Sequence, residues 1–298
     1  MKIVECVPNF SEGRDREKVE AITREIASVG NVKILDMEMD ANHNRSVVTF
    51  TCEPQYAVEA AFRGIKKASE LINMDNHQGE HPRFGSADVI PFIPVSEVSL
   101  KECVDLANQL GKRVGEELNI PVFMYSDAAV TEKRKNLENI RHKNFQYEQL
   151  KTEIGKGDYI PDFGPLELSK AGASIIGARD FLVAYNVNLR SQDMEAGKKI
   201  AKALRAKDGG LSFVKALAFY LEDKKCVQIS MNLTNYKKTP VYRAYEMVKL
   251  EASRYGIEIM ESEVIGLIPL DAILETGRFY MRMNSFKSNQ IFEKKVWE

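Results

Sequence analysis

The order of strand-like and helix-like segments constrains the fold of this chain more than any other feature. Apolar alternation and helical spacing in the first half predict strand, helix, strand, strand, helix, strand, at residues 3–10, 14–29, 32–39, 46–52, 54–71 and 88–94. The same order returns at residues 181–189, 193–205, 212–222, 225–232, 242–255 and 257–264. Two βαββαβ units predict an α+β fold with two ferredoxin-like subdomains, in which helices cover one face of each antiparallel sheet.

The segment between the two units predicts how the chain divides. It contains a helix at residues 100–118, a strand at 121–125 and a charged stretch at 131–144 with helical character. A Gly- and Pro-rich piece at 155–165 has no helical period. We therefore predict an N-terminal subdomain with its linker, residues 1–177, a C-terminal subdomain, residues 178–298, and a ligand cleft between them.

Composition and motifs exclude several classes of function. The net charge of −1 gives no general attraction to nucleic acid or to an anionic membrane. The four cysteines are far apart, without zinc spacing, and no segment resembles a signal peptide or a membrane span. Phosphate-binding loops, dinucleotide fingerprints and Ser or Cys nucleophile motifs are absent. These features predict a cytoplasmic protein that acts on small molecules.

Residues 77–85, HQGEHPRFG, have the composition of a reactive loop. They hold two of the four histidines, four positions apart, with Glu80 and Arg83 beside His81. Histidine exchanges protons near neutral pH, so His81 is the candidate acid–base group, although a structural loop histidine is the alternative. The spacing of His77 and His81 also fits a helical zinc pair, but the glycine and proline between and after them disfavour a helix. We predict no metal.

The turn at residues 40–45 is a second candidate. Asp36, Glu38 and Asp40 alternate, so they share one face of their predicted strand. With Asn44 and Arg45 they form a polar hairpin tip, which is either a solvated turn or a substrate site. A guanidinium such as Arg45 binds a carboxylate through two parallel hydrogen bonds.

Two further segments are ambiguous. Asp162, Phe163, Gly164 and Pro165 offer a carboxylate, an aromatic face and exposed amides, which suit a flat polar heterocycle such as a pterin. The alternative is a linker with one buried aromatic residue. The basic stretch at residues 133–143 is either a solvated helix face or an attractor of a polyanionic tail.

Long segments of the chain resemble the glutamate formiminotransferase family in the same order as in that family. They are VECVPNFSEG at 4–13, GEHPRFGSADVIPFIPV at 79–95, PDFGP at 161–165, GAR at 177–179 and VIGLIP at 264–269. The resemblance runs from the first residues almost to the C-terminus. It implies two ferredoxin-like subdomains with folate in the cleft between them, and a homodimer.

The family resemblance also implies a reaction. A formimino group passes from N-formimino-L-glutamate to N5 of tetrahydrofolate, the co-substrate, during histidine degradation. His81 matches the family's catalytic histidine, and Asp162–Pro165 match part of its folate-binding segment. We expect Arg45 and Arg83 to hold substrate carboxylates and Glu80 or Asp40 to stabilise the cationic formimino group. Animal members carry a fused cyclodeaminase, for which this chain has no room. Whether a separate cyclodeaminase partner acts with it stays open from the sequence.

Two alternatives remain from the sequence. The donor is either a formimino or a formyl compound, such as N-formylglutamate or 5-formyltetrahydrofolate, because the formyl oxygen is nearly isosteric with the formimino nitrogen. A non-catalytic folate or amino-acid sensor is the third reading, since ferredoxin-like folds host many functions.

Overall fold

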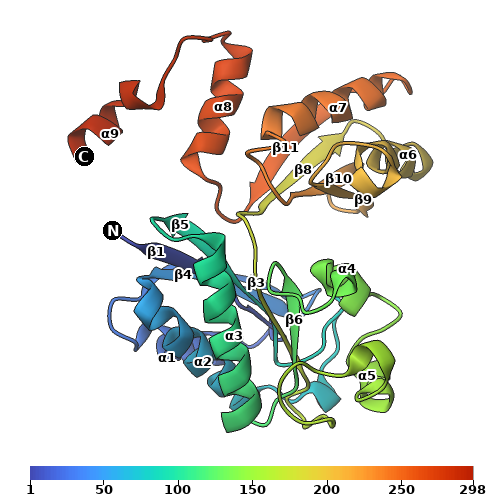
Figure 1. Ribbon diagram of the computed structural model, residues 1–298. Coiled ribbons are helices and arrows are strands. Elements are labelled where there is room, and N and C mark those ends of the chain that lie inside the picture. The colour runs from blue at the N-terminus through green and yellow to red at the C-terminus, as the bar shows by residue number, and fades with distance from the viewer. Residues whose placement is uncertain (298) are drawn as a thin grey trace. The chain divides into compact units, whose positions relative to one another are not determined.

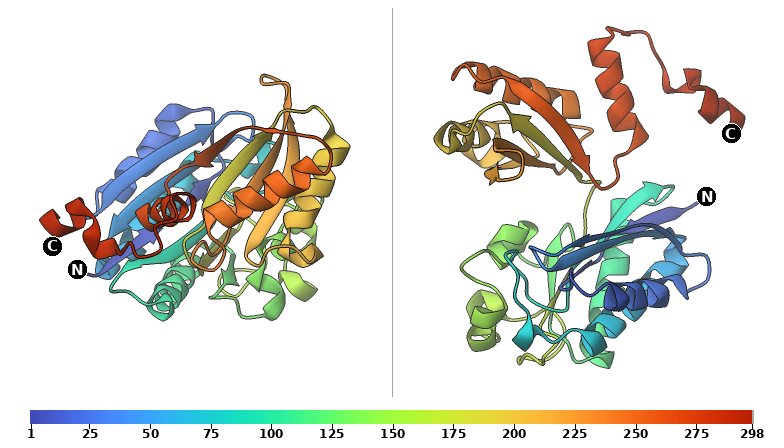
Figure 2. Two further views of the ribbon diagram at one scale, coloured as in Figure 1. Left: turned by 90° about the horizontal axis from the view of Figure 1, so that it is seen from above. Right: turned by 180° about the vertical axis from the view of Figure 1, so that it is seen from behind.

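The computed structural model describes residues 1–297 and contains two units, Met1–Asp180 and Phe181–Glu298. Both units are mixed α+β structures, and each contains a ferredoxin-like βαββαβ arrangement (Figure 1, Figure 2). The predicted fold class is therefore confirmed.

The N-terminal unit has seven strands and five α-helices among its described residues. The strands are β1 (Ile3–Cys6), β2 (Asn9–Phe10), β3 (Lys33–Asp40), β4 (Arg45–Cys52), β5 (Ala87–Ser96), β6 (Val122–Ser126) and β7 (Ser174–Ala178). The helices are α1 (Arg16–Ala27), α2 (Pro54–Leu71), α3 (Leu100–Glu117), α4 (Leu137–Ile140) and α5 (Tyr147–Glu153). Short 3-10 helices lie at Met74–Asn76, Glu132–Lys135 and Gly157–Tyr159.

The strands of this unit form one seven-stranded sheet. β3 pairs with β4, β4 pairs with β1 and β2, and both of these pair with β5, all antiparallel. This part has the strand order of a ferredoxin-like sheet. β7 then adds parallel to β5, and β6 adds parallel to β7. The predicted single strand at 3–10 is divided at Val7 and Pro8, because a proline has no N–H to donate to a ladder.

Helices α1, α2 and α3 cover one face of this sheet (Figure 1). Alternate strand residues, among them Val4, Cys6 and Phe50, meet the apolar sides of these helices in the main core. Asp15 begins α1 by accepting the N–H groups of Glu17 and Lys18. The other face is covered at its β6 end by α4, α5 and the segments around them, which form a second, smaller core.

The helical character predicted for residues 131–144 is present only in part, as two short helices rather than one. The chain makes a 3-10 turn at Glu132–Lys135, then α4, and leaves helical geometry at Arg141. The guanidinium of Arg134 is tied to Asp162 and to the carbonyls of Asp158 and Ile160. These tertiary contacts outweigh the local helical preference of a charged stretch.

The C-terminal unit has four strands and four α-helices among its described residues. The strands are β8 (Val183–Leu189), β9 (Val214–Leu221), β10 (Cys226–Leu233) and β11 (Ile259–Ile265). The helices are α6 (Met194–Leu204), α7 (Val241–Ser253), α8 (Leu270–Tyr280) and α9 (Phe292–Trp297), with 3-10 turns at Ala206–Asp208 and Ser288–Gln290.

The four strands of this unit form an antiparallel sheet in the order β11-β8-β10-β9, which is again the ferredoxin-like order. Helices α6 and α7 lie against one face of it (Figure 2). Their apolar sides are buried there, and Ile200, Leu204 and Val248 are fully buried. No helix in the described part of the chain is long and apolar enough to cross a membrane.

Candidate functional site

The N-terminal sheet presents a polar face opposite α1, α2 and α3. The register is continuous from Glu5, opposite Thr51, to Asn9, opposite Val47, so both side chains point away from the helices. Arg45 lies two positions from Val47 and shares this face. Along β3, Asp36, Glu38 and Asp40 lie opposite Thr49, Val47 and Arg45, which confirms that the three acids share one face.

The reactive loop rests on the tip of the β3–β4 hairpin. Asn44 adopts a left-handed φ of 48°, and its side chain accepts the Gly13 N–H at 2.9 Å and donates to the Gln78 carbonyl at 2.9 Å. A Cβ at Gly79 would lie 2.3 Å from the carbonyl oxygen of His43, so only glycine permits this approach. The structure therefore gives Asn44 a clear role in holding the loop.

His81 lies in a cluster of charged side chains that come from distant parts of the chain. Its Nδ1 is 2.9 Å from Nη1 of Arg45, and the same Arg45 nitrogen is 3.3 Å from Oδ2 of Asp88. Asn9 Oδ1 accepts from the Nε and Nη2 of Arg45, at 3.1 and 2.5 Å. The structure thus brings the predicted residues His81 and Arg45 into direct contact.

Asp88 contacts both Arg45, the neighbour of His81, and a second arginine, Arg141. Its Oδ2 is 2.8 Å from Nη2 of Arg141, and its Oδ1 accepts the Phe84 N–H at 2.8 Å. The Arg141 side chain is 5% exposed, and its contact with Asp88 is an ion pair outside hydrogen-bond angles. Nε and Nη2 of Arg141 therefore have no hydrogen-bond partner among the described residues.

The electrostatics keep His81 neutral. Burial, followed by the charges of Arg45 and Arg141, lowers the pKa of His81 to about 3. At neutral pH the imidazole is therefore unprotonated, as a general base must be.

The tautomer of His81 depends on its two Nδ1 neighbours. Arg45 Nη1 only donates, whereas the Pro82 carbonyl, 2.7 Å from Nδ1, only accepts. Arg45 has Asp88 as a second acceptor, while the Pro82 carbonyl has no other hydrogen bond among the described residues. We infer that Nδ1 carries the proton and donates to Pro82, which leaves Nε2 as the basic atom.

Arg83 is placed differently from its predicted role. Its side chain is buried, and its five N–H groups bond to His77 Nδ1, the His77 carbonyl, Gln146 and both oxygens of Glu148. No donor is left for a substrate carboxylate. This geometry favours a structural role for Arg83, which fixes the His77 end of the loop against residues 146–148.

The two predicted carboxylates lie at the edge of the cluster. Glu80 is exposed and makes no hydrogen bond within the described part of the chain. Asp40 accepts the N–H groups of Asn42 and His43 and lies 2.5 Å from the His43 ring. The His43 ring in turn meets the His81 ring edge-on, with centroids 6.1 Å apart. The His43 ring therefore lies between Asp40 and the His81 ring.

The segment Asp162–Pro165 packs against α3 and β6. Asp162 Oδ2 accepts the Met124 N–H at 2.7 Å and binds Arg134 at 2.6 Å, so this carboxylate is already paired. Phe163 contacts α3 beside Gly111 and Gly115, and Gly164 has a left-handed φ of 86°. Pro165 is partly exposed. The described contacts do not join this segment to His81.

Sequence reasoning missed Asn9, His43, Asp88 and Arg141. Asp88 had a usable signal, because a carboxylate at the head of an apolar strand is unusual unless it is paired. Arg141 stood in a basic stretch that read as a solvated surface, and only the fold shows its burial. Among the described residues, no group of three or more His, Cys, Asp or Glu side chains is arranged to hold a metal ion.

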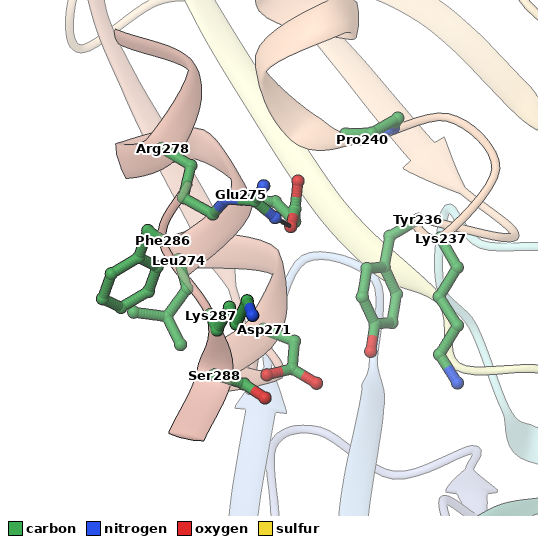
Figure 3. A pocket seen from close by; sticks show the side chains of 10 residues that line it. All are labelled: Tyr236, Lys237, Pro240, Asp271, Leu274, Glu275, Arg278, Phe286, Lys287 and Ser288. Atoms are coloured by element: carbon green, nitrogen blue, oxygen red, sulfur yellow. Dashed lines mark hydrogen bonds and ion pairs between the residues drawn. The ribbon is translucent and has the colours of Figure 1, made fainter. Parts of the chain in front are cut away.

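A separate hollow of about 570 Å³ lies in the C-terminal unit (Figure 3). It is lined by Tyr236, Lys237, Pro240, Asp271, Leu274, Glu275, Arg278, Phe286, Lys287 and Ser288. Its charges are mixed, and Arg278 is paired with Glu275 at 2.5 Å. It contains none of the predicted site residues, and the His81 cluster is the better candidate because it combines a proton acceptor with buried cations.

Comparison with known proteins gives matches along nearly the whole chain. Residues 3–179 match the family profile described as "Formiminotransferase domain, N-terminal subdomain", and residues 184–296 match "Formiminotransferase domain". The "Glutamate formimidoyltransferase" of Thermoplasma acidophilum is 62% identical over 99% of this chain and 98% of its own length. The protein of the same name from Streptococcus pyogenes is 41% identical, over 96% of this chain and 95% of its own. The "Formimidoyltransferase-cyclodeaminase" of Mus musculus is 40% identical over 94% of this chain but only 52% of its own length.

Proposed function

This chain belongs to the formiminotransferase domain family, and on that premise we propose that it transfers the formimino group of N-formimino-L-glutamate to N5 of tetrahydrofolate. The products are 5-formiminotetrahydrofolate and L-glutamate. The observation that carries the proposal is the near-complete match to relatives named glutamate formimidoyltransferase. The chain is accordingly an enzyme, a transferase of one-carbon groups.

His81 is the proposed acid–base residue. The N5 lone pair attacks the formimino carbon, and the electrons of the C=N bond move to nitrogen. His81 Nε2 accepts the proton that N5 loses and returns it to the glutamate nitrogen. The lone pair on the imino nitrogen then restores the C=N bond as the C–N bond to glutamate breaks. One residue serves both steps because the proton taken in the first is the proton needed in the second. The ring is held for this by the Pro82 carbonyl, which accepts from Nδ1.

Buried Arg141 and partly buried Arg45 supply the proposed anion site. Arg45 and Arg141 both pair with Asp88, and one carboxylate cannot fully offset two guanidiniums. A carboxylate of formiminoglutamate would complete the charge balance and the hydrogen bonds of Arg141. It would also raise the pKa of His81 from about 3 toward neutrality by opposing the two cations that depress it. Substrate binding would therefore strengthen the base.

The remaining assignments belong to the same proposal. Asp40 and exposed Glu80 would stabilise the cationic formimino group, and Asp162–Pro165 would bind folate, as the family resemblance implies. We propose a homodimer in the cytoplasm that uses tetrahydrofolate as co-substrate and needs no metal. Size-exclusion chromatography with light scattering tests the dimer, and activity after chelator treatment tests the metal.

A steady-state assay tests the reaction. Purified protein is mixed with tetrahydrofolate and either formiminoglutamate or N-formylglutamate, and the folate absorbance is followed. We expect turnover with formiminoglutamate and a kcat/KM at least tenfold lower with the formyl donor. A preference for the formyl donor would replace the donor assignment, and binding without turnover of either donor would support the sensor instead.

A further inference from the structure

Glu5 is a buried carboxyl group that the proposed chemistry does not use. It lies in the middle of β1, with a residue exposure of 4%. Its sequence neighbours Val4 and Cys6 point into the core beneath α1 and α2, so Glu5 points to the opposite, polar face. The residues directly opposite it are Thr51 on β4 and Ile93 on β5, and neither carries a charge.

This carboxyl has no hydrogen bond or ion pair within 4 Å in the part of the chain that the structure describes. Among the described residues, Arg179 is the cation whose charge acts on it. Burial raises the pKa of Glu5 to about 7, and Arg179 offsets only part of that rise. Buried carboxyl groups are normally hydrogen-bonded, because an unpaired one loses its solvation without compensation. A ligand with N–H donors would remove this penalty.

Glu5 and the His81 cluster lie on one face of one sheet. The β1–β2 register against β4 and β5 is unbroken between Glu5 and Asn9, and four residues of extended chain span about 13 Å. Asn9 bonds Arg45, which contacts His81. A flat bicyclic ring with one hydrogen-bonding edge at Glu5 would therefore point its far edge toward His81.

The residues between these two points are compatible with a ring. Val47 and Thr49 on β4 and Pro91 on β5 alternate with core residues and so face the same side as Glu5; Val47 is partly exposed, and Thr49 and Pro91 are buried. They are small or apolar and carry no charge. The glutamate part of the donor is anionic and would be repelled by Glu5, whereas a heterocycle with N–H donors would not.

We propose that Glu5 binds the 2-amino and N3–H edge of the tetrahydropterin ring, with its two carboxylate oxygens accepting these two parallel N–H donors. The inference rests on the proposed function, because it identifies the folate co-substrate as the ligand. The two-donor edge of the ring resembles the fork that a guanidinium offers a carboxylate. N5 lies on the other ring of the bicycle, so this orientation brings the reacting nitrogen toward His81.

The test compares tetrahydrofolate with its 2-desamino-2-methyl analogue, which lacks the amino donor. For the wild type, we expect calorimetric Kd and steady-state KM to be about 10- to 100-fold higher for the analogue, the usual loss for a hydrogen bond to a charged group. Glu5→Gln should raise both constants for tetrahydrofolate by a similar factor and reduce the analogue-to-folate ratio to about threefold or less. The KM for formiminoglutamate should change less than threefold.

Glu17→Gln is the matched control, because Glu17 is exposed in the first turn of α1 on the helix-covered side. It should retain the wild-type ratio. A Glu5→Gln protein that folds, as judged by circular dichroism, and keeps the wild-type ratio overturns the inference. If that variant does not fold, equal affinity of the wild type for the two folates overturns it as well. Wild-type protein that binds tetrahydrofolate without transferring the formimino group refutes the proposed reaction but leaves the Glu5 contact standing, so the two failures are distinguishable.

Discussion

Replacement of Asp88 by asparagine is the perturbation whose cost the structure specifies best. The Asp88 side chain is 1% exposed, and its carboxylate lies 3.3 Å from Arg45 and 2.8 Å from Arg141. Asp88→Asn keeps the size of the side chain and an acceptor for the Phe84 N–H. It removes the negative charge and leaves two guanidiniums together in a buried site.

The magnitude follows from those two distances. With an effective dielectric constant of about 20, each ion pair contributes an attraction of about 5–6 kcal/mol. Water and the asparagine dipole recover much of this, and removal of one partner from a buried pair typically costs about 3–5 kcal/mol. We therefore expect the free energy of unfolding of the N-terminal unit to fall by about 4 kcal/mol. That is a large share of the ~5–15 kcal/mol by which domains are usually stable.

Native-state hydrogen exchange of the β5 amides is the appropriate assay. It reports the opening free energy of this sheet, whereas the single tryptophan, Trp297, lies near the C-terminus of the chain. Asp105→Asn is the control, because Asp105 is exposed on α3, and it should change stability by less than about 0.5 kcal/mol. An Asp88→Asn protein within 1 kcal/mol of the wild type would refute the argument that Asp88 compensates the buried arginines.

Three other changes test the loop and the acid–base group. Gly79→Ala places a methyl group 2.3 Å from the His43 carbonyl oxygen, so we expect the free energy of unfolding to fall by about 1–3 kcal/mol and turnover to fall as well. Gly30→Ala is the control, because its methyl group meets no atom within 4 Å, and it should leave thermal melts unchanged. His43→Asn should reduce kcat/KM about three- to tenfold, the worth of one aromatic ring contact, and an unchanged rate would remove His43 from the site. Because the pKa of His81 is lowered to about 3, its ring is neutral at every higher pH, and kcat/KM should show no acid limb near pH 6.5. In the substrate complex the bound carboxylate opposes the two arginines and raises the pKa of His81, so the acid limb of kcat should lie at higher pH than that of kcat/KM. If both profiles instead have an acid limb near pH 6.5, and both limbs vanish in His81→Asn, the argument is contradicted.

The fold could be predicted from the sequence where local signals were sufficient. Alternating apolar residues and helical spacing within a few dozen residues predict each βαββαβ unit. The parallel extension of the first sheet does not, because β7 (Ser174–Ala178) follows a Gly- and Pro-rich loop and pairs with strands far away in the chain. The sequence did not predict the path of residues 131–144 for a similar reason, since the burial of Arg134 against Asp162 depends on tertiary structure.

The candidate site likewise contains residues that the sequence indicated and residues that only the fold reveals. Residue types and motif pointed to His81 and Arg45, and the fold places them in contact although they are 36 positions apart. The sequence could not show that Arg83 donates hydrogen bonds to Gln146 and Glu148, which are more than 60 positions away. Nor could it show that Arg141 is buried beside Asp88, because that depends on how residues 131–160 cover the sheet.

The transfer of label from donor to folate tests the central claim most directly. Formiminoglutamate labelled with ¹³C in the formimino carbon is mixed with tetrahydrofolate and an excess of the enzyme, and the carbon is followed by NMR. We predict that the label moves to N5 of the folate as one glutamate is released, and that His81→Asn slows this step by about two to four orders of magnitude. His142→Asn, the same substitution at an exposed histidine, should leave the rate unchanged. Label that stays on glutamate or is released to water, or a well-folded His81→Asn protein with near-normal transfer, would contradict the account.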